Sequence, residues 1–143
     1  MKLLMILQIA LGVVFGVILV LYAWWRGPRT ERLMLAVGLI VTALLYVVFA
    51  LGGGASAGWS ALEVVGVLPF GVFAWLGLRA SSVWLALGWA AHVSWDVGLH
   101  IGAGAPAFVP TFFPMFCIGF DLLVAGYIGA RAYAGRASRP EAA

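Results

Sequence analysis

Long apolar segments are the feature that most constrains how this chain can fold. A transmembrane helix needs about 20 mostly apolar residues, and about 17–25 are tolerated. Five segments qualify, the third and the fifth near the lower limit: Leu3–Trp25, Leu33–Leu51, Ala61–Leu78, Val83–Ile101 and Met115–Ala130. We therefore predict an all-α integral membrane protein, a bundle of five transmembrane helices that forms a single domain over residues 1–143.

The composition excludes other classes of protein. Hydrophobic residues make up 65% of the chain and charged residues only 9%, whereas soluble domains carry about 45–50% apolar and about 25% charged residues. A water-soluble globular fold, a disordered chain and a nucleic-acid-binding module are therefore excluded. The lipid bilayer is the expected partner. Five short helices enclose only a small pocket, so a homo-oligomer is a further possibility.

The arginines predict the orientation of the bundle. They lie in the first loop, in the third loop and in the C-terminal tail, all on one side of a five-span chain: Arg26, Arg29, Arg32, Arg79, Arg131, Arg136 and Arg139. Basic loops stay in the cytoplasm. We therefore expect a multi-pass protein of the bacterial inner membrane, with the N-terminus outside and the C-terminus in the cytoplasm. Lys2 is the exception to this pattern.

Ionisable residues inside the predicted spans carry the functional information. There are five of them: Glu63, His92, Asp96, His100 and Asp121. An aspartate at mid-helix costs at least about 2.5–3.5 kcal/mol on insertion scales, so such residues usually serve a function.

Helix geometry places these residues at similar depths. At a rise of about 1.5 Å per residue, Asp96 lies roughly 6 Å and His92 roughly 12 Å deeper than His100, which is near the outer end of its span. Asp121 lies roughly 10 Å below the outer edge of the fifth span, and Tyr46 falls in the same layer. We expect these residues to line one outward-facing pocket.

The predicted site combines acid–base residues with aromatic residues. The candidate catalytic residues are Asp96, Asp121, His92, His100 and Glu63. The candidate substrate-binding residues are Tyr46, Trp89, Trp95 and Phe113.

The fourth span could also supply metal ligands. His92, Asp96 and His100 recur at i, i+4 and i+8 and so follow one stripe of a helix. His92 with Asp96, joined by Asp121, would make a site for zinc or iron; the pair of Asp96 with His100 is an alternative. Without a metal, the same residues can form carboxylate–histidine pairs.

Simpler interpretations remain open for each residue. The segment Ser60–Glu63 matches the S-x-x-E capping box of a helix start. His100 can lie in the headgroup region, and Asp96 and Asp121 can serve as structural hydrogen-bonding groups. Tyr46 can be an ordinary packed aromatic residue.

Two segments resemble a signature of small uncharacterised bacterial integral membrane proteins. The first is W-A-A-H-V-S-W-D-V-G-L-H over residues 89–100, and the second is F-P-M-F-C-I-G-F-D over residues 113–121. The resemblance implies that these segments belong together, and it carries no activity.

We expect a membrane-embedded enzyme that uses carboxylate and histidine side chains on a lipophilic substrate, such as a lipid or an isoprenoid. An isomerase, a cyclase or a hydrolase would suit such a site. The alternatives are a small proton or metal-cation transporter, or an accessory membrane subunit. A conduction path should continue through the inner half, where the sequence offers only Thr42 and Tyr127 as strongly polar residues.

Overall fold

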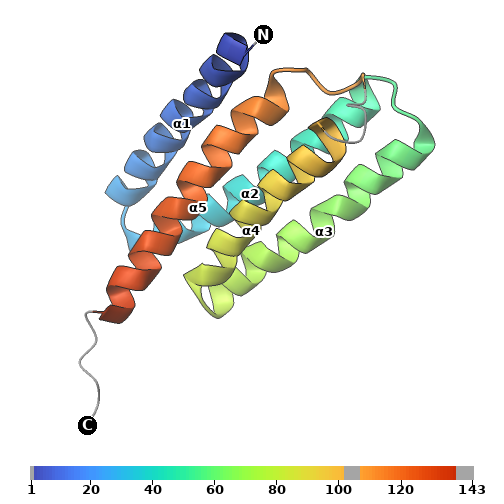
Figure 1. Ribbon diagram of the computed structural model, residues 1–143. Coiled ribbons are helices and arrows are strands. Elements are labelled where there is room, and N and C mark those ends of the chain that lie inside the picture. Colours follow the sequence, from blue (N-terminus) through green and yellow to red (C-terminus); the bar gives the residue numbers. More distant parts are fainter. Residues whose placement is uncertain (1, 102–106, 138–143) are drawn as a thin grey trace.

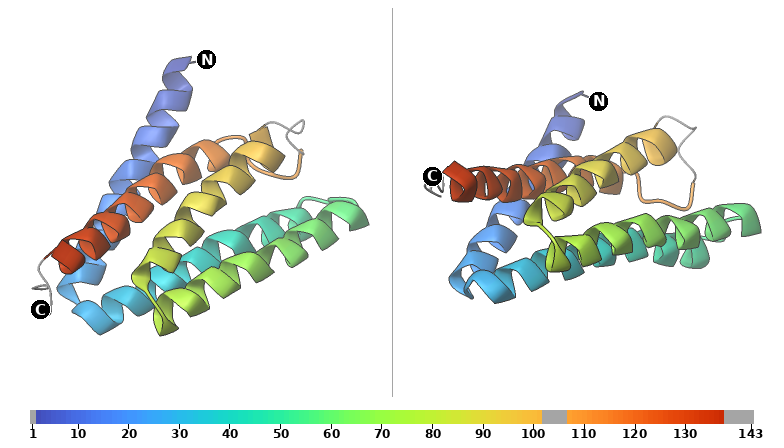
Figure 2. Two further views of the ribbon diagram at one scale, coloured as in Figure 1. Left: turned by 60° about the horizontal axis from the view of Figure 1, so that its bottom comes forward. Right: turned by 90° about the horizontal axis from the view of Figure 1, so that it is seen from below.

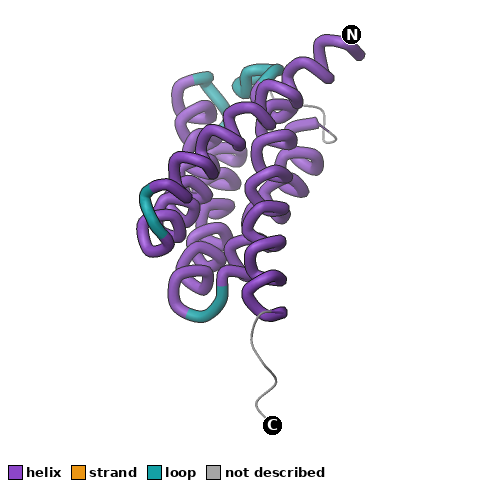
Figure 3. Tube along the Cα trace, turned by 90° about the vertical axis from the view of Figure 1, so that its left-hand side faces the viewer, coloured by secondary structure: helices purple, strands orange, loops and turns teal. Residues whose placement is uncertain are grey.

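The computed structural model describes residues 2–101 and 107–137, and the described chain is built from helices joined by short loops (Figures 1 and 3). The elements are α1 (Lys2–Trp25), α2 (Pro28–Gly52), α3 (Ala57–Arg79), α4 (Ser82–Trp95), the π-helical turn η1 (Asp96–Ile101) and α5 (Phe113–Ala137). The described residues contain no strand. The prediction of an all-α bundle is confirmed.

Four helices are long and apolar enough to cross a membrane: α1, α2, α3 and α5. The fourth predicted span corresponds to α4 together with η1, which follows it without a break. The outward faces of the helices are rich in large apolar side chains, as lipid contact requires; in α1, for example, Leu3, Ile18 and Leu21 are exposed. These are the features of an integral membrane protein.

Successive helices run in opposite directions, so the start of α1 and the end of α5 lie at opposite ends of the bundle (Figure 1). The α1–α2 turn, the α3–α4 turn and the end of α5 share one end, which we call the arginine-rich end. It carries Arg26, Arg29, Arg32, Arg79 and Arg131. The segregation of arginines expected from a five-span chain is therefore present among the described residues.

The beginning of α3 corrects the capping-box interpretation. The helix starts at Ala57, four residues before the predicted span, because Ser56 is its N-cap and accepts a hydrogen bond from the backbone N–H of Trp59 at 3.4 Å. Ser60 already lies within the first turn, so Ser60–Glu63 does not form a capping box. Glu63 is instead a buried residue of the helix body.

Glycines allow α1 to pack closely on α5. A Cβ atom at Gly12 would overlap the carbonyl oxygen of Phe116, and one at Gly119 would overlap the carbonyl oxygen of Ile9. Small residues at such crossings let helix backbones approach in membranes. The helix α1 packs chiefly on α5, and its N-terminal end stands away from α3 and α4 (Figure 2).

Two apolar clusters surround the middle of the bundle. The larger one lies towards the arginine-rich end and includes the fully buried Leu39, Trp89 and Val124. The smaller one lies towards the opposite end and is made of Tyr46, Val109, Phe113 and Cys117. The buried His92 lies between these clusters, since its ring contacts Phe70 of the larger one and Tyr46 of the smaller one.

Candidate functional site

Side chains from four helices and η1 meet in a buried polar cluster. It consists of Tyr46 from α2, Glu63 from α3, His92 from α4, Asp96 and His100 from η1, and Asp121 from α5. Each of these residues is at most 2% exposed. The structure thus brings together the five ionisable residues that the depth argument placed in one layer.

His92 lies between the two aspartates. Its Nδ1 is 2.8 Å from Oδ2 of Asp121 and 3.5 Å from Oδ2 of Asp96. A carboxylate only accepts hydrogen bonds, so the proton of a neutral His92 belongs on Nδ1 and is donated to Asp121. The opposite nitrogen, Nε2, is then the basic atom, and it makes no hydrogen bond with any described residue.

Asp96 is buried without hydrogen bonds of ordinary geometry. Both carboxylate oxygens are enclosed, and neither has a hydrogen-bond partner among the described residues. The Tyr46 hydroxyl faces Asp96 but likewise makes no hydrogen bond of ordinary geometry with the described residues. Leaving a buried polar group unsatisfied costs about 1–3 kcal/mol, and more for a charged group. Such a group is more typical of a site that handles protons or ligands than of a structural contact.

A second carboxylate–histidine pair lies towards the end opposite the arginines. Nε2 of His100 is 3.3 Å from Oε1 of Glu63, and Nε1 of Trp95 donates to Oε2 of Glu63 at 3.3 Å. His100 is therefore buried within the bundle. Trp95, predicted to bind substrate, orients the Glu63 carboxylate in this structure.

Tyr46 connects the two carboxylate–histidine pairs. Its ring stacks on that of His100, with centroids 4.0 Å apart and planes 8° from parallel, and lies 5.8 Å from that of His92. Phe113 meets the other side of Tyr46 edge-on at 5.4 Å. Both aromatic residues thus lie at the polar cluster.

Trp89 and Phe70 are two aromatic residues of the larger apolar cluster that lie near His92. Trp89 lies one turn from His92 towards the arginine-rich end, and its indole N–H donates to the carbonyl of Leu35 at 3.1 Å. It packs within the larger apolar cluster. Phe70 was not singled out from the sequence, yet its ring meets that of His92 at 4.9 Å. An aromatic residue in an apolar run gives no signal that could have revealed this contact.

The π-helical turn η1 sets the direction of His100. In an α-helix each residue turns by about 100°, so residues eight apart drift off a common face. A π turn bonds i to i+5 and therefore turns less per residue, which returns His100 towards the face that carries His92. Such turns occur frequently at functional sites. A straight α-helix, as expected from the sequence, would not turn His100 in this way.

A cavity of about 410 Å³ adjoins the polar cluster at His100. Val109, Thr111 and Pro114 line its other side, before and at the start of α5. Of the polar cluster, only His100 lines this cavity, so Asp96 and Asp121 are closed off behind it.

The inner part of the polar cluster has the donors of a metal site. His92, Asp96 and Asp121 each offer one ligand atom, and these atoms lie within 4.8 Å of one another. One nitrogen and two carboxylate donors suit zinc or iron. The alternative pair of Asp96 with His100 is disfavoured, because His100 is engaged by Glu63.

A family model for proteins of unknown function, DUF6010, matches residues 5–135. The chain belongs to this family. The match includes every residue of the polar cluster, and it fits the expectation of an uncharacterised family. No curated protein and no solved structure matches this DUF6010 member.

Proposed function

We propose that this DUF6010 protein is a membrane-embedded enzyme that performs acid–base chemistry on a lipophilic substrate, a lipid or an isoprenoid. One observation carries the proposal. His92 is held through Nδ1 by Asp121, while its Nε2 makes no hydrogen bond with the described residues. An oriented imidazole with one uncommitted nitrogen is the usual form of a general base.

Asp96 supplies the second group that such chemistry needs. A double-bond isomerisation removes a proton from one carbon and returns a proton to another, so a base and an acid must lie close together. The Nδ1 atom of His92 is 3.5 Å from the carboxylate of Asp96. In this scheme Nε2 of His92 accepts the proton and the carboxyl group of Asp96 donates one. Return of a proton from His92 to Asp96, which lie 3.5 Å apart, then restores the starting charge of both groups.

The pair of His100 and Glu63 would connect His92 and Asp96 to the cavity. His100 borders the cavity, contacts Glu63 and stacks on Tyr46, whose hydroxyl faces Asp96. This arrangement favours a role for His100 at the entrance for the substrate, and a role for Glu63 and Tyr46 in proton exchange between Asp96 and the cavity.

The orientation follows from the arginines. We propose that the arginine-rich end faces the cytoplasm of a bacterial cell and that the cavity beside His100 opens towards the outer leaflet of the inner membrane. With Cys117 replaced by alanine, single cysteines at Gly54 and Ala80 should react with impermeant reagents from opposite sides. Labelling of both from the same side would contradict this topology.

Transport of protons or metal cations is the alternative function. A conduction path would have to pass from the polar cluster to the arginine-rich end. Leu39, Trp89 and Val124 fill that region and are fully buried. This apolar layer favours an enzyme over a channel, and proton or zinc flux into proteoliposomes would favour the transporter.

The enzyme proposal can be tested before the substrate is identified. The purified protein is reconstituted with a total bacterial lipid extract, and the lipids are compared by mass spectrometry before and after incubation. We expect a lipid conversion that the double variant Asp96→Asn, Asp121→Asn abolishes. Thr42→Val is the control and should retain it, because the Thr42 hydroxyl bonds only to backbone carbonyls of its own helix. Conversion that persists in the double variant would refute the proposal.

A further inference from the structure

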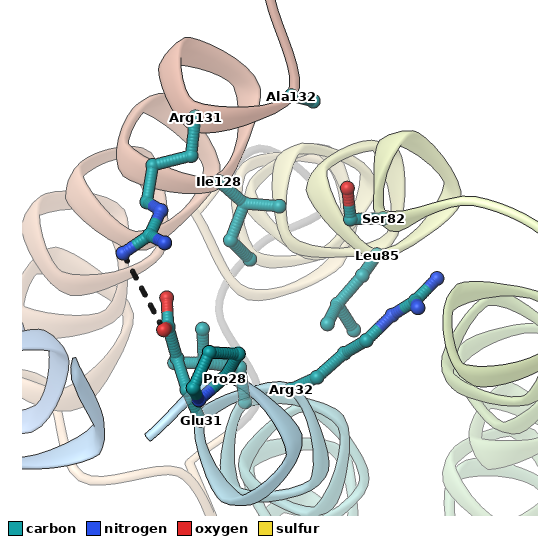
Figure 4. A pocket seen from close by; sticks show the side chains of 9 residues that line it. Pro28, Glu31, Arg32, Ser82, Leu85, Ile128, Arg131 and Ala132 are labelled. Carbon is teal, nitrogen blue, oxygen red and sulfur yellow. Dashed lines mark ion pairs between the residues drawn. The ribbon is translucent and has the colours of Figure 1, made fainter. Parts of the chain in front are cut away.

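A second cavity lies at the arginine-rich end, far along the bundle from His100. It has a volume of about 220 Å³ and lies between α2, α4 and α5 (Figure 4). Arg32, Ser82 and Arg131 line it and also line an adjoining hollow of about 540 Å³. Leu85 and Ile128 form an apolar part of its wall. The cavity therefore combines cationic side chains with apolar surface.

Both arginines have donors that the described protein does not use. Nε of Arg32 donates to the carbonyl of Gly77 at 2.8 Å, which anchors the side chain and leaves its two terminal nitrogens without a hydrogen bond among the described residues. Arg131 uses only Nη1, which donates to the hydroxyl of Tyr127 at 3.0 Å and lies 3.4 Å from Glu31. Each guanidinium group thus has one bonded nitrogen and further N–H groups that make no hydrogen bond with the described residues.

Glu31 positions Arg131 and does not compete for the remaining donors. Its carboxylate accepts a hydrogen bond of 2.7 Å from Tyr127 and lies beside Arg131 (Figure 4). With Arg32 included, these charged residues of the wall carry a net positive charge. The N-terminal end of α4, which begins at Ser82, adds the positive end of a helix dipole.

We propose that this cavity, which has Arg131 on one side and Arg32 on the other, binds a phosphate-bearing anion, either the headgroup of an anionic phospholipid or a soluble phosphate monoester. Guanidinium groups match the oxygens of phosphate and bind them by charge-assisted hydrogen bonds. Basic pockets between transmembrane helices are typical headgroup sites. The site is separate from the polar cluster and does not depend on the proposed catalysis.

Lipid binding provides the first test. The full-length protein in detergent is titrated with phosphatidylglycerol and with phosphatidylcholine of the same chain length, and bound lipid is counted by native mass spectrometry. We expect phosphatidylglycerol to be retained preferentially. Arg32→Gln and Arg131→Gln should each weaken its binding by about fivefold, the effect of one basic residue near an anionic lipid. Equal retention of the two lipids in the wild type, with no effect of glycerol 3-phosphate either, would overturn the proposal.

Two further variants separate a built site from general surface charge. Arg26→Gln removes the same charge at the same end, but Arg26 contacts Tyr22 on α1 and does not line the cavity. It should leave binding unchanged, and a loss equal to that of Arg32→Gln would overturn the proposal. Ala132→Leu retains all the charged groups and places a larger side chain in the wall of both hollows, so it should weaken binding even where an arginine variant fails to fold. Unchanged binding in Ala132→Leu would also count against the site.

Glycerol 3-phosphate distinguishes the two sources of phosphate. If the natural ligand is a soluble phosphate monoester, this compound should raise the melting temperature of the wild type but not of Arg32→Gln. If the ligand is a lipid headgroup, only phosphatidylglycerol should bind, and its binding should weaken as salt increases. Either pattern supports a phosphate site in this cavity.

Discussion

Nδ1 of His92 and Oδ2 of Asp121 are 2.8 Å apart, in a hydrogen bond that joins α4 to α5 at the centre of the bundle. Both side chains are fully inaccessible to solvent. Because the bond fixes which nitrogen of His92 carries the proton, Asp121 determines how His92 can act. This is the positioning role that a carboxylate has beside a catalytic histidine.

The tautomer of His92 is a direct consequence of this bond. We expect ¹⁵N NMR spectra of the histidine-labelled protein to show His92 protonated at Nδ1 and not at Nε2 when it is neutral. Asp121→Val should remove this preference, because the acceptor is lost. His100, which contacts Glu63, serves as the internal control and should keep its signals. A His92 protonated at Nε2 in the wild type would contradict the assignment of its free nitrogen.

The buried carboxylate of Asp96 should lower the stability of the folded protein, as expected of a residue kept for function. Its carboxylate makes no hydrogen bond among the described residues, so Asp96→Val should increase the free energy of unfolding by about 1–3 kcal/mol while abolishing any activity. Unfolding in mild detergent, followed by circular dichroism, would measure the change.

Replacing a carboxylate that has hydrogen-bond partners should lower the free energy of unfolding. Glu31 accepts a hydrogen bond from Tyr127 and lies beside Arg131, so Glu31→Val should destabilise the protein. If Asp96→Val destabilised it as much as Glu31→Val does, Asp96 would be a structural residue.

The sequence predicts the convergence of the site for a simple physical reason. Membrane-spanning helices stand roughly side by side, so counting residues from the ends of a span gives the depth of a side chain at about 1.5 Å per residue. This count of residues places His92, Asp96 and Asp121 at similar depths in the bundle. It also placed Tyr46 and His100 nearby, because both lie on segments that cross the same layer.

The details that depend on backbone irregularity could not be predicted in this way. The π turn of η1 has no marker in the segment Asp96–Ile101, and it changes the direction of His100. The start of α3 depends on Ser56, which offers the same capping chemistry as Ser60. The pairing of Glu63 with His100 depends on both the π turn and the start of α3, so the sequence did not predict this pair.

Close packing of α1 on α5 should depend on individual glycines. Gly119→Ala would place a methyl group against the backbone carbonyl of Ile9, which cannot move as a side chain can. We expect a loss of about 1–3 kcal/mol in stability, the usual cost of overpacking. Gly126→Ala, on the same helix, is the matched control because its Cβ would meet no atom within 4 Å. Equal effects of the two substitutions on unfolding would show that the α1–α5 crossing is looser than described.

The metal content of the protein tests the donor set of His92, Asp96 and Asp121. If zinc or iron is bound there, elemental analysis of protein purified without chelator should give about one ion per chain, since three protein ligands make one site. His92→Ala and Asp121→Ala should each lower the content to background, because each removes one of the three ligand atoms that lie within 4.8 Å of one another. His100→Ala is the matched control, as His100 pairs with Glu63, and it should retain the ion. A stoichiometric metal that persists in both ligand variants would show that these ligands are wrong, whereas protein free of metal would leave the hydrogen-bonded His92–Asp121 pair as the working centre.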